Sequence, residues 1–409
     1  MTSDIDTLIF QALFGDEETK KQKRKKIRDI SLEKGIVSTS IHHLYQAFGT
    51  GKIFGFTVPA INIRALTYDT AAIIFELMLK HNIGAVVFEI ARSEIEYTDQ
   101  RPDEYTTSIL AGAIKAGYTG PVFLQGDHYQ FSKNKFSIDA DAEVNRIKEL
   151  TKESIEAGFY NIDIDASTLV DLEKSTLPEQ QKTNSRITAE MTRFIRSIQP
   201  DTIQVSIGGE IGHIGGKNST ANDFIAFMDE YKKEIAENGI SKVSVQTGTS
   251  HGGIPTTDGK IEDVKLDFSV LESVSEIARD RYGMGGAVQH GASTLPNELF
   301  GKFVEHKTLE IHLATGFQNI VYENMPILLR EEIYVWLKDN LKAEWETDWT
   351  EEQFLYKTRK KAFGPFKKQL FTLSLQDKQP IADALSQQLE FLFEKLNTFN
   401  TRELTDQFI

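Results

Sequence analysis

The sequence predicts an α/β protein built on a closed (β/α)₈ TIM barrel, with additional helices at both ends of the chain. Short apolar runs rich in β-branched residues recur through residues 52–325, and longer segments of helical period separate them. Strands that alternate with helices pair in parallel, and about eight such units fit a closed barrel. A third observation is that no glycine-rich phosphate loop follows the first run.

The predicted strands are short, and each one is followed by polar residues. They are FTVPAIN (56–62), GAVVFEI (84–90), PVFLQG (121–126), FYNIDID (159–165), TIQVSIG (202–208), KVSVQTG (242–248), GGAVQH (285–290) and LEIHLAT (309–315). Helical segments between them include residues 68–81, 143–157 and 268–281. Thr67 or Asp69 can begin the first of these helices, and Gly158 ends the second.

An open, doubly wound sheet is the alternative to the barrel. That fold would place a glycine-rich phosphate-binding turn directly after its first strand. After Asn62 the chain reads IRALTYD, which contains no glycine. The barrel is therefore the preferred prediction.

The chain divides into three predicted parts. Residues 1–50 form an N-terminal helical extension with polar turns, residues 51–326 form the catalytic barrel, and residues 327–409 form a C-terminal helical extension. The last part has no strand pattern and contains amphipathic segments such as WLKDNLKAEW. These helices could pack on the barrel or form a subunit contact.

The composition excludes several classes of protein. The 409 residues carry a formal net charge of −14, so nucleic acid is not expected as a partner, and the basic run KKQKRKK (20–26) is interpreted as a solvated helix face. The absence of cysteine excludes disulfides, thiolate metal sites and thiol nucleophiles. No apolar run is long enough to span a membrane, and no secretory signal is recognised, so we expect a cytoplasmic protein.

Polar residues gather at the predicted ends of the strands, where a (β/α)₈ barrel places its catalytic groups. These residues are Asn62, Arg92, Asp127, His128, Asp165, Glu210, His251, His290 and Thr315. Only nine histidines are present, and three of them directly follow the third, sixth and seventh strands. Three imidazoles with an open fourth position are typical of a catalytic zinc site, and nearby carboxylates would orient them.

Glycines accompany these candidate ligands. Gly252 follows His251, Gly291 follows His290 with Ser293 close behind, and the segment GGEIGHIGG surrounds Glu210. Backbone N–H groups in such loops can approach an anion closely, and phosphate sites after the last two strands are common in this fold. The alternative is that these are ordinary turn glycines.

Together, these motifs resemble the class II, metal-dependent ketose-bisphosphate aldolases, of which fructose-bisphosphate aldolase is the type, over about residues 56–323. The motifs are FTVPAINI, GDHYQ, AGFYNIDIDAS, GGEIGHIGG, TSHGG and QHGAS, in the order and spacing of the family. The resemblance implies site residues with these roles: Asn62 as the active-site asparagine, Asp127 as the group that protonates or polarises the aldehyde, His128, His251 and His290 as metal ligands, Glu210 and Asp165 as acids at the metal, and Gly252, Gly291, Ser293 and Thr315 as phosphate-binding positions.

The resemblance further implies reversible, metal-dependent aldol cleavage of a phosphorylated ketose to dihydroxyacetone phosphate and an aldehyde. Zn²⁺ is the expected cofactor, although imidazole and carboxylate ligands also suit other divalent metals. A homodimer is expected as well.

Five positions depart from the family pattern: Ala91, Lys217, Asn218, His312 and Ala314. They leave the substrate and the proton-exchanging base open, with His213 and His312 as candidates for that base. Arg92 and Lys217 either bind a substrate anion or lie in water.

Three other functions stay possible at this stage. The first is a metal-dependent sugar epimerase working by cleavage and re-addition. The second is a TIM-barrel metal hydrolase. The third is a non-enzymatic binding protein, which the retained histidines disfavour.

Overall fold

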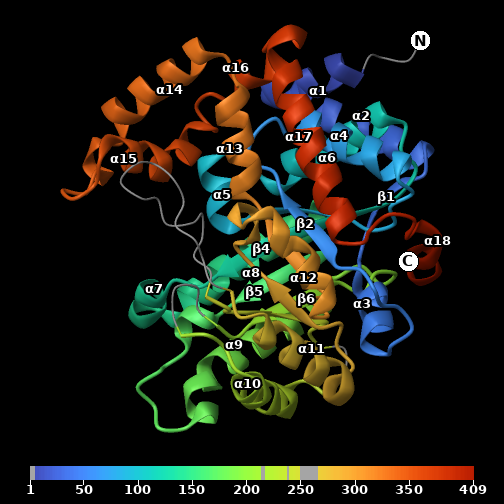
Figure 1. Cartoon of the computed structure of the whole chain (residues 1–409), viewed down its shortest axis with the longest axis vertical. Helices are drawn as coiled ribbons and strands as arrows, with labels where there is room; N and C mark the ends of the chain where they lie inside the picture. Colours follow the sequence, from blue (N-terminus) through green and yellow to red (C-terminus); the bar gives the residue numbers. More distant parts are fainter. Residues whose placement is uncertain (1–4, 213–216, 237–238, 249–265) are drawn as a thin grey trace.

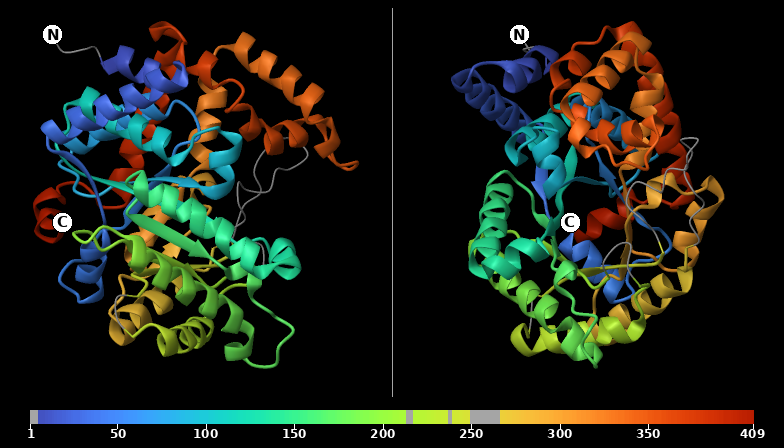
Figure 2. Two further views of the ribbon diagram at one scale, coloured as in Figure 1. Left: turned by 180° about the vertical axis from the view of Figure 1, so that it is seen from behind. Right: turned by 90° about the vertical axis from the view of Figure 1, so that its left-hand side faces the viewer.

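The computed structural model describes residues 5–212, 217–236, 239–248 and 266–409. Eight parallel strands, β2 to β9, form a closed barrel, since β2 pairs with both β3 and β9 and each remaining strand pairs with its neighbours. Helices surround the barrel, as Figures 1 and 2 show. The predicted fold class is confirmed.

Most strands of the barrel are short, and all of them except β4 are wholly buried. The bounds of the strands are β1 Ile36–Thr39, β2 Val58–Asn62, β3 Val87–Ala91, β4 Gly120–Gln130, β5 Asn161–Asp165, β6 Ser206–Glu210, β7 Lys242–Val245, β8 Ala287–Gln289 and β9 Glu310–Leu313. All eight predicted strands are present. The fifth predicted run begins later than expected, at Ser206, and Glu210 is the last residue of its strand.

β1 was not predicted, because residues 1–50 were expected to contain only helices. Its four residues pair in parallel with the beginning of β4, from Ile36 opposite Gly120 to Thr39 opposite Phe123. Only Ile36 in this strand is buried. A strand this short, with one buried side chain, shows no alternation that a sequence pattern could reveal.

The helices follow the strands as expected. Those of the barrel region are α4 Thr67–Lys80, α5 Arg92–Tyr97, α6 Pro102–Ala116, α7 Lys133–Ile138, α8 Ala140–Glu156, α9 Leu177–Ile198, α10 Ala221–Glu234, α11 Phe268–Tyr282, α12 Phe300–Glu305 and α13 Thr315–Asn324. Local signals explain several of the boundaries. The Asp139 carboxylate accepts a hydrogen bond from the Ala142 N–H where α8 begins, and Gly158 has a φ of 98° just after its end.

Further helices extend the barrel at both ends of the chain. They are α1 Ile5–Phe14, α2 Glu17–Glu33, α3 His42–Gly49, α14 Ile327–Asn340, α15 Glu351–Thr358, α16 Lys367–Phe371, α17 Leu375–Lys395 and α18 Arg402–Thr405. α17 packs on α4 and α13 (Figure 1), and the Thr57 N–H donates to the Leu396 carbonyl at 3.0 Å. The C-terminal helices therefore pack on the barrel, which is one of the two arrangements expected. The proposed division at residues 50 and 326 stays a prediction. None of the helices in the described part of the chain combines the length and the apolar character of a membrane span.

The barrel interior holds a buried lysine. The Lys242 Nζ donates to Asp163 Oδ2 at 2.9 Å, to Glu310 Oε1 at 2.5 Å and to Gln125 Oε1 at 2.7 Å. These acids raise the pKa of Lys242 against the opposing effect of its burial. The lysine is therefore held as a cation between two buried carboxylates.

Replacing this lysine tests its structural role. We expect Lys242→Ala to lower the free energy of unfolding by about 3–5 kcal/mol, because two buried carboxylates lose their cation. Denaturant unfolding of the variant and of the wild type measures the difference. Lys25→Ala, at an exposed pair with Asp29, should change it by about 0.5 kcal/mol or less. A loss below about 1 kcal/mol in Lys242→Ala would contradict the assignment.

Candidate active site and metal centre

A cavity of about 500 Å³ lies at the ends of the barrel strands. Eight of the expected site residues line it: Asn62, Arg92, Asp127, His128, His290, Gly291, Ser293 and Thr315. Asp165 and Glu210 lie beside it, in contact with His128. His251, Gly252 and His213 fall outside the described residues.

His128 occupies an irregular part of β4. The register with β5 shifts between Gly126 and Tyr129, and His128 has a φ of 43°, a conformation that costs energy for a residue other than glycine. Gly126 is required there, because a Cβ at that position would lie 2.5 Å from the Tyr129 ring. The bulge thus aims the His128 side chain into the cavity.

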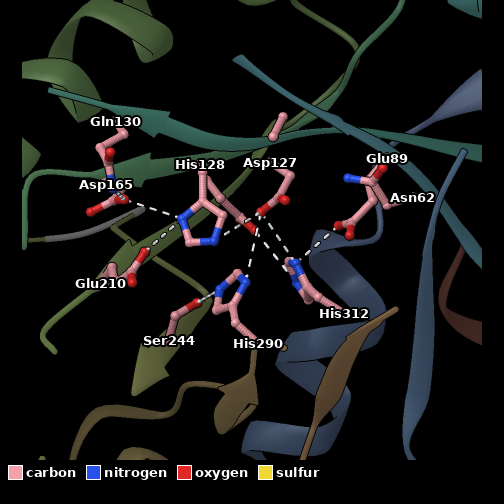
Figure 3. Close-up of polar contacts among 12 residues, drawn as sticks. Asn62, Glu89, Asp127, His128, Gln130, Asp165, Glu210, Ser244, His290 and His312 are labelled. Atoms are coloured by element: carbon pink, nitrogen blue, oxygen red, sulfur yellow. Dashed lines mark hydrogen bonds and ion pairs between the residues drawn. The ribbon is translucent and has the colours of Figure 1, made fainter. Parts of the chain in front are cut away.

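Two acids face one nitrogen of His128. The Nδ1 atom lies 3.1 Å from Asp165 Oδ2 and 3.1 Å from Glu210 Oε2 (Figure 3). Burial lowers the pKa of His128, but Asp127 and Glu210 outweigh it and hold that pKa well above its ordinary value. Burial, followed by the Asp165 charge, raises the pKa of Glu210 to about 8. This excess of buried acids favours a cation at the site.

His290 completes a group suited to a metal. His128, Glu210 and His290 each offer a ligand atom, and these atoms lie within 4.8 Å of one another. We call these three residues the first metal group. The His290 Nε2 lies 2.8 Å from Ser244 Oγ, a contact that fixes the ring. Two imidazoles and a carboxylate are a donor set that suits zinc and other divalent first-row metals.

Asp165 supports the first metal group through His128. Its Oδ2 accepts a hydrogen bond from Gln130 Nε2 at 2.6 Å, and its Oδ1 accepts one from Ser167 Oγ at 2.6 Å. Its other neighbour is the His128 ring. Carboxylates placed in this way fix the orientation of a metal-binding imidazole.

Asp127 lies between the histidines. Its Oδ1 is 3.9 Å from His128 Nε2, 3.9 Å from His290 Nδ1 and 3.2 Å from His312 Nδ1. The expected catalytic acid is thus buried at the cavity wall with a ring nitrogen on each side (Figure 3).

Glu94, Arg64 and Glu89 are among the residues around the cavity that were not predicted from the sequence. Glu94 accepts a hydrogen bond from Asn62 Nδ2 at 2.5 Å and from the backbone N–H of Ala91 at 2.8 Å. It also pairs with Arg64 at 2.7 Å. Glu89 Oε2 lies 3.0 Å from His312 Nδ1. The sequence did offer one signal for Glu89, because an acidic residue inside the apolar run VVFEI is unusual and indicates a buried charge.

The loops after β8 and β9 form another wall of the cavity. Gly291 has a φ of 68°, and Ser293 Oγ accepts a hydrogen bond from the Gly316 N–H at 3.1 Å. A Cβ at Gly316 would lie 2.4 Å from the Ser293 carbonyl oxygen, so this close approach needs glycine. Thr315 begins α13, whose N-terminal N–H groups are suited to an anion.

Cationic side chains that line the cavity include Arg92 and Lys360. Arg92 lies between the cavity and a neighbouring groove, and its buried Nε has no hydrogen-bond partner among the described residues. Lys360 comes from the short helix Arg359–Ala362 of the C-terminal extension, and its Nζ lies 5.8 Å from the centre of the Tyr97 ring. Lys217 lines the neighbouring groove instead of the cavity and is exposed.

Comparison with known proteins identifies a family. The family model described as fructose-bisphosphate aldolase class-II matches residues 43–370. The fructose-bisphosphate aldolases of Rhizobium meliloti (strain 1021) and Sinorhizobium medicae (strain WSM419) are each 27% identical over 168 residues. Each match covers 37% of this chain and 43% of the relative, so the chain spans less than half of the length of these relatives.

Solved structures share the fold. A fructose-bisphosphate aldolase from Campylobacter jejuni has a TM-score of 0.52 at 16% identity and covers 90% of this chain and 96% of its own. A fructuronate-tagaturonate epimerase from Cohnella laeviribosi has a TM-score of 0.56 at 13% identity. The match covers 87% of this chain and 85% of the epimerase. A probable tagatose 6-phosphate kinase from Sinorhizobium meliloti 1021 has a TM-score of 0.58 at 14% identity. The match covers 85% of this chain and 100% of that protein. At these identities the similarity concerns the fold alone.

Proposed function

Because the chain belongs to the class II fructose-bisphosphate aldolase family, we propose that it catalyses metal-dependent, reversible aldol cleavage of a phosphorylated ketose. The products would be dihydroxyacetone phosphate and an aldehyde. The observation that carries this proposal is the first metal group beside Asp127, in a cavity that is also lined by Thr315, where α13 begins.

The residues of the first metal group would hold the ion, which we take to be Zn²⁺, together with His251. Bound there, a divalent ion supplies Lewis-acid stabilisation for the negative charge that develops next to the ketose carbonyl. Asp165 keeps the His128 ring in position, and Ser244 does the same for His290. A Schiff-base lysine is not needed for such a reaction.

Asp127 is the proposed proton carrier. In the cleavage direction its carboxylate accepts the proton of the C4 hydroxyl as the bond between C3 and C4 breaks. In the synthesis direction the carboxylic acid returns that proton to the aldehyde oxygen. Burial of Asp127 between ring nitrogens limits the positions open to its carboxylate.

Phosphate binding is assigned to the wall formed by Gly291, Ser293 and Thr315, together with Gly252. A phosphate held there would keep the reacting carbons beside the first metal group and Asp127. The free energy of phosphate binding would thus be used to orient the substrate for reaction. Asn62 is positioned by Glu94 and would bind a substrate hydroxyl. The proposed enzyme acts as a homodimer.

Arg92 would bind a substrate anion, since its buried Nε has no partner among the described residues. We expect Arg92→Gln to raise KM for a phosphorylated ketose about 10- to 100-fold, the loss expected for one charge-assisted hydrogen bond, with a smaller effect on kcat. Steady-state kinetics measure both constants. Arg186→Gln, on the exposed face of α9, is the control. An unchanged KM in the Arg92 variant would remove Arg92 from the binding site.

Product analysis separates this proposal from its alternatives. Metal-loaded protein is incubated with ketose monophosphates and bisphosphates, and the products are identified by NMR. Triose products support the aldolase. A C4-epimeric ketose without net cleavage would replace it by the epimerase, for which the departure from the family at His312 leaves room. Turnover of esters or amides, with none of ketose phosphates, would replace it by the hydrolase.

A further inference from the structure

His312 of β9 has a carboxylate at each of its ring nitrogens. The side chain is buried at the wall of the cavity. Its Nε2 lies 2.5 Å from Glu310 Oε1. Its Nδ1 lies 3.2 Å from Asp127 Oδ1, and Glu89 Oε2 is 3.0 Å from the same nitrogen (Figure 3). Each ring nitrogen of His312 therefore has an acidic oxygen as its hydrogen-bond partner.

These contacts make the His312 ring a cation. An ionised carboxylate only accepts hydrogen bonds, so a ring nitrogen that faces one donates its proton. An imidazole with a proton on both nitrogens is positively charged. Burial lowers the pKa of His312, but the charges of Glu89 and Asp127 outweigh it and hold that pKa well above its ordinary value. The ring thus supplies the positive charge between Glu310 and Asp127.

The barrel interior fixes the orientation of this ring through Glu310. That carboxylate accepts hydrogen bonds from Lys242 Nζ at 2.5 Å and from the Tyr45 hydroxyl. Both of these side chains are fully buried, and Lys242 makes further hydrogen bonds to its neighbours in the barrel. A side chain held by charge-assisted hydrogen bonds in a close-packed interior has little freedom to move. The ring therefore presents Nδ1 to Asp127 in one fixed orientation.

Of the three histidine rings around Asp127, that of His312 is the nearest. Its Nδ1 is 3.2 Å from Asp127 Oδ1, whereas His128 Nε2 and His290 Nδ1 are each 3.9 Å away. The two more distant rings belong to the first metal group. A donor that is itself held in place limits the directions in which its acceptor can point. His312 is thus placed to orient the Asp127 carboxylate.

The same contacts argue against His312 as the base that exchanges a carbon-bound proton. A general base needs an atom without a proton, within hydrogen-bonding reach of the proton that it removes. Nε2 donates to Glu310 and Nδ1 donates to Asp127, so both nitrogens already carry a proton that is bound to an acid.

We propose that His312 is a positioning residue for Asp127 and not the proton-exchanging base. This inference rests on the proposed function, in which the Asp127 carboxylate accepts the proton of the C4 hydroxyl. In that step the proton passes from the hydroxyl oxygen to the carboxylate. His312 keeps both of its own protons, and its Nδ1–H holds the carboxylate in place. The ring connects the buried charges of the barrel interior to the acid that moves the proton.

Two neutral substitutions test where the donor must lie. The amide nitrogen of asparagine lies close to the place of the imidazole Nδ1, and that of glutamine lies close to the place of Nε2. Both variants lose the charge, but only His312→Asn keeps a donor beside Asp127. We expect His312→Gln to lower kcat for cleavage of a phosphorylated ketose about 10- to 100-fold, with KM nearly unchanged, because one hydrogen bond to a charged group is lost.

His312→Asn should stay within about fivefold of the wild-type kcat. Circular dichroism checks that both variants fold. Equal losses of kcat in the two folded variants would overturn the proposal, because the position of the donor would then not matter. An unchanged kcat in His312→Gln would overturn it equally.

Proton exchange separates a positioning residue from a base. Exchange of a carbon-bound proton of dihydroxyacetone phosphate with D₂O does not involve the C4 hydroxyl, so it does not require Asp127. We expect His312→Gln to exchange this proton within about twofold of the wild-type rate. Loss of exchange in parallel with loss of cleavage would make His312 the base and overturn the proposal.

A double variant tests whether His312 acts through Asp127. If it does, adding His312→Gln to Asp127→Asn removes nothing more, and kcat should stay within about twofold of that of Asp127→Asn alone. A further loss as large as that of the single His312→Gln variant would show that the two residues act independently, which would overturn the proposal.

NMR gives a measurement that does not depend on turnover. Full-length, zinc-loaded protein with ¹⁵N-labelled histidine should show protons on both ring nitrogens of His312, identified by their absence in His312→Gln. Asp127→Asn should shift the Nδ1–H signal and leave the Nε2–H signal, and His306→Asn, at a surface histidine paired with Glu272, should change neither. A His312 Nδ1 without a proton would overturn the proposal. If the wild type cleaved no phosphorylated ketose, the proposed function would fail, and these spectra would still decide whether His312 holds Asp127.

Discussion

His128→Ala is expected to lose the ion of the first metal group and at least about 10³-fold in kcat/KM. Lewis-acid stabilisation is worth several kcal/mol, and each 1.4 kcal/mol corresponds to a factor of ten. His128 lies at the centre of the group, because Asp165, Glu210 and Asp127 all face its ring. Elemental analysis of the metal-loaded variant and steady-state kinetics measure the two effects.

His306→Ala is the matched control for this variant and should keep both metal and activity, since that ring pairs with Glu272 on the surface. The decisive comparison is between metal content and rate. A His128→Ala protein that retains full metal content would remove His128 from the ligand set, even if its rate fell.

Asp127→Asn should lower kcat about 10²- to 10⁴-fold, the range expected when a positioned general acid–base group is removed. The amide is nearly isosteric with the carboxylate but cannot accept the C4 hydroxyl proton. The three residues of the first metal group are unchanged in this variant, so at least one ion per chain should remain. Single-turnover kinetics with a phosphorylated ketose, together with metal analysis, test both statements.

Asn340→Asp offers a comparison for Asp127→Asn, because it exchanges the same two groups at an exposed residue of α14 that lies outside the cavity lining. The change of kcat in this control variant measures the effect of the same exchange of groups at a site away from the cavity. If Asp127→Asn kept more than about a tenth of the wild-type kcat, Asp127 would not be the proton carrier.

Much of the barrel was predictable because its signals are local. Each strand is an apolar run, each is followed by a helical segment, and the polar residues come where the strand ends. His128 and His290, which were expected at strand ends, both line the cavity, and their role as metal ligands stays a prediction. β1 was not predicted, because a single buried residue, Ile36, cannot show a hydrophobic periodicity.

The residues missed at the site share a different physical cause. Glu89 lies inside a strand instead of at its end, and its role depends on His312, which lies more than two hundred residues later. Lys360 reaches the cavity only because the C-terminal helices pack over the barrel. Contacts between elements far apart in the sequence leave no trace in the local pattern, so composition and periodicity could not reveal them.

The central claim is that this cavity stabilises negative charge next to a ketose carbonyl with the help of a bound metal. Exchange of a carbon-bound proton of dihydroxyacetone phosphate with D₂O measures that step directly, without the second substrate. We predict that metal-loaded protein exchanges one such proton, as followed by ¹H NMR, that chelation abolishes the exchange and that added Zn²⁺ restores it. Absence of exchange in the metal-loaded protein, or exchange that survives complete chelation, would contradict the account.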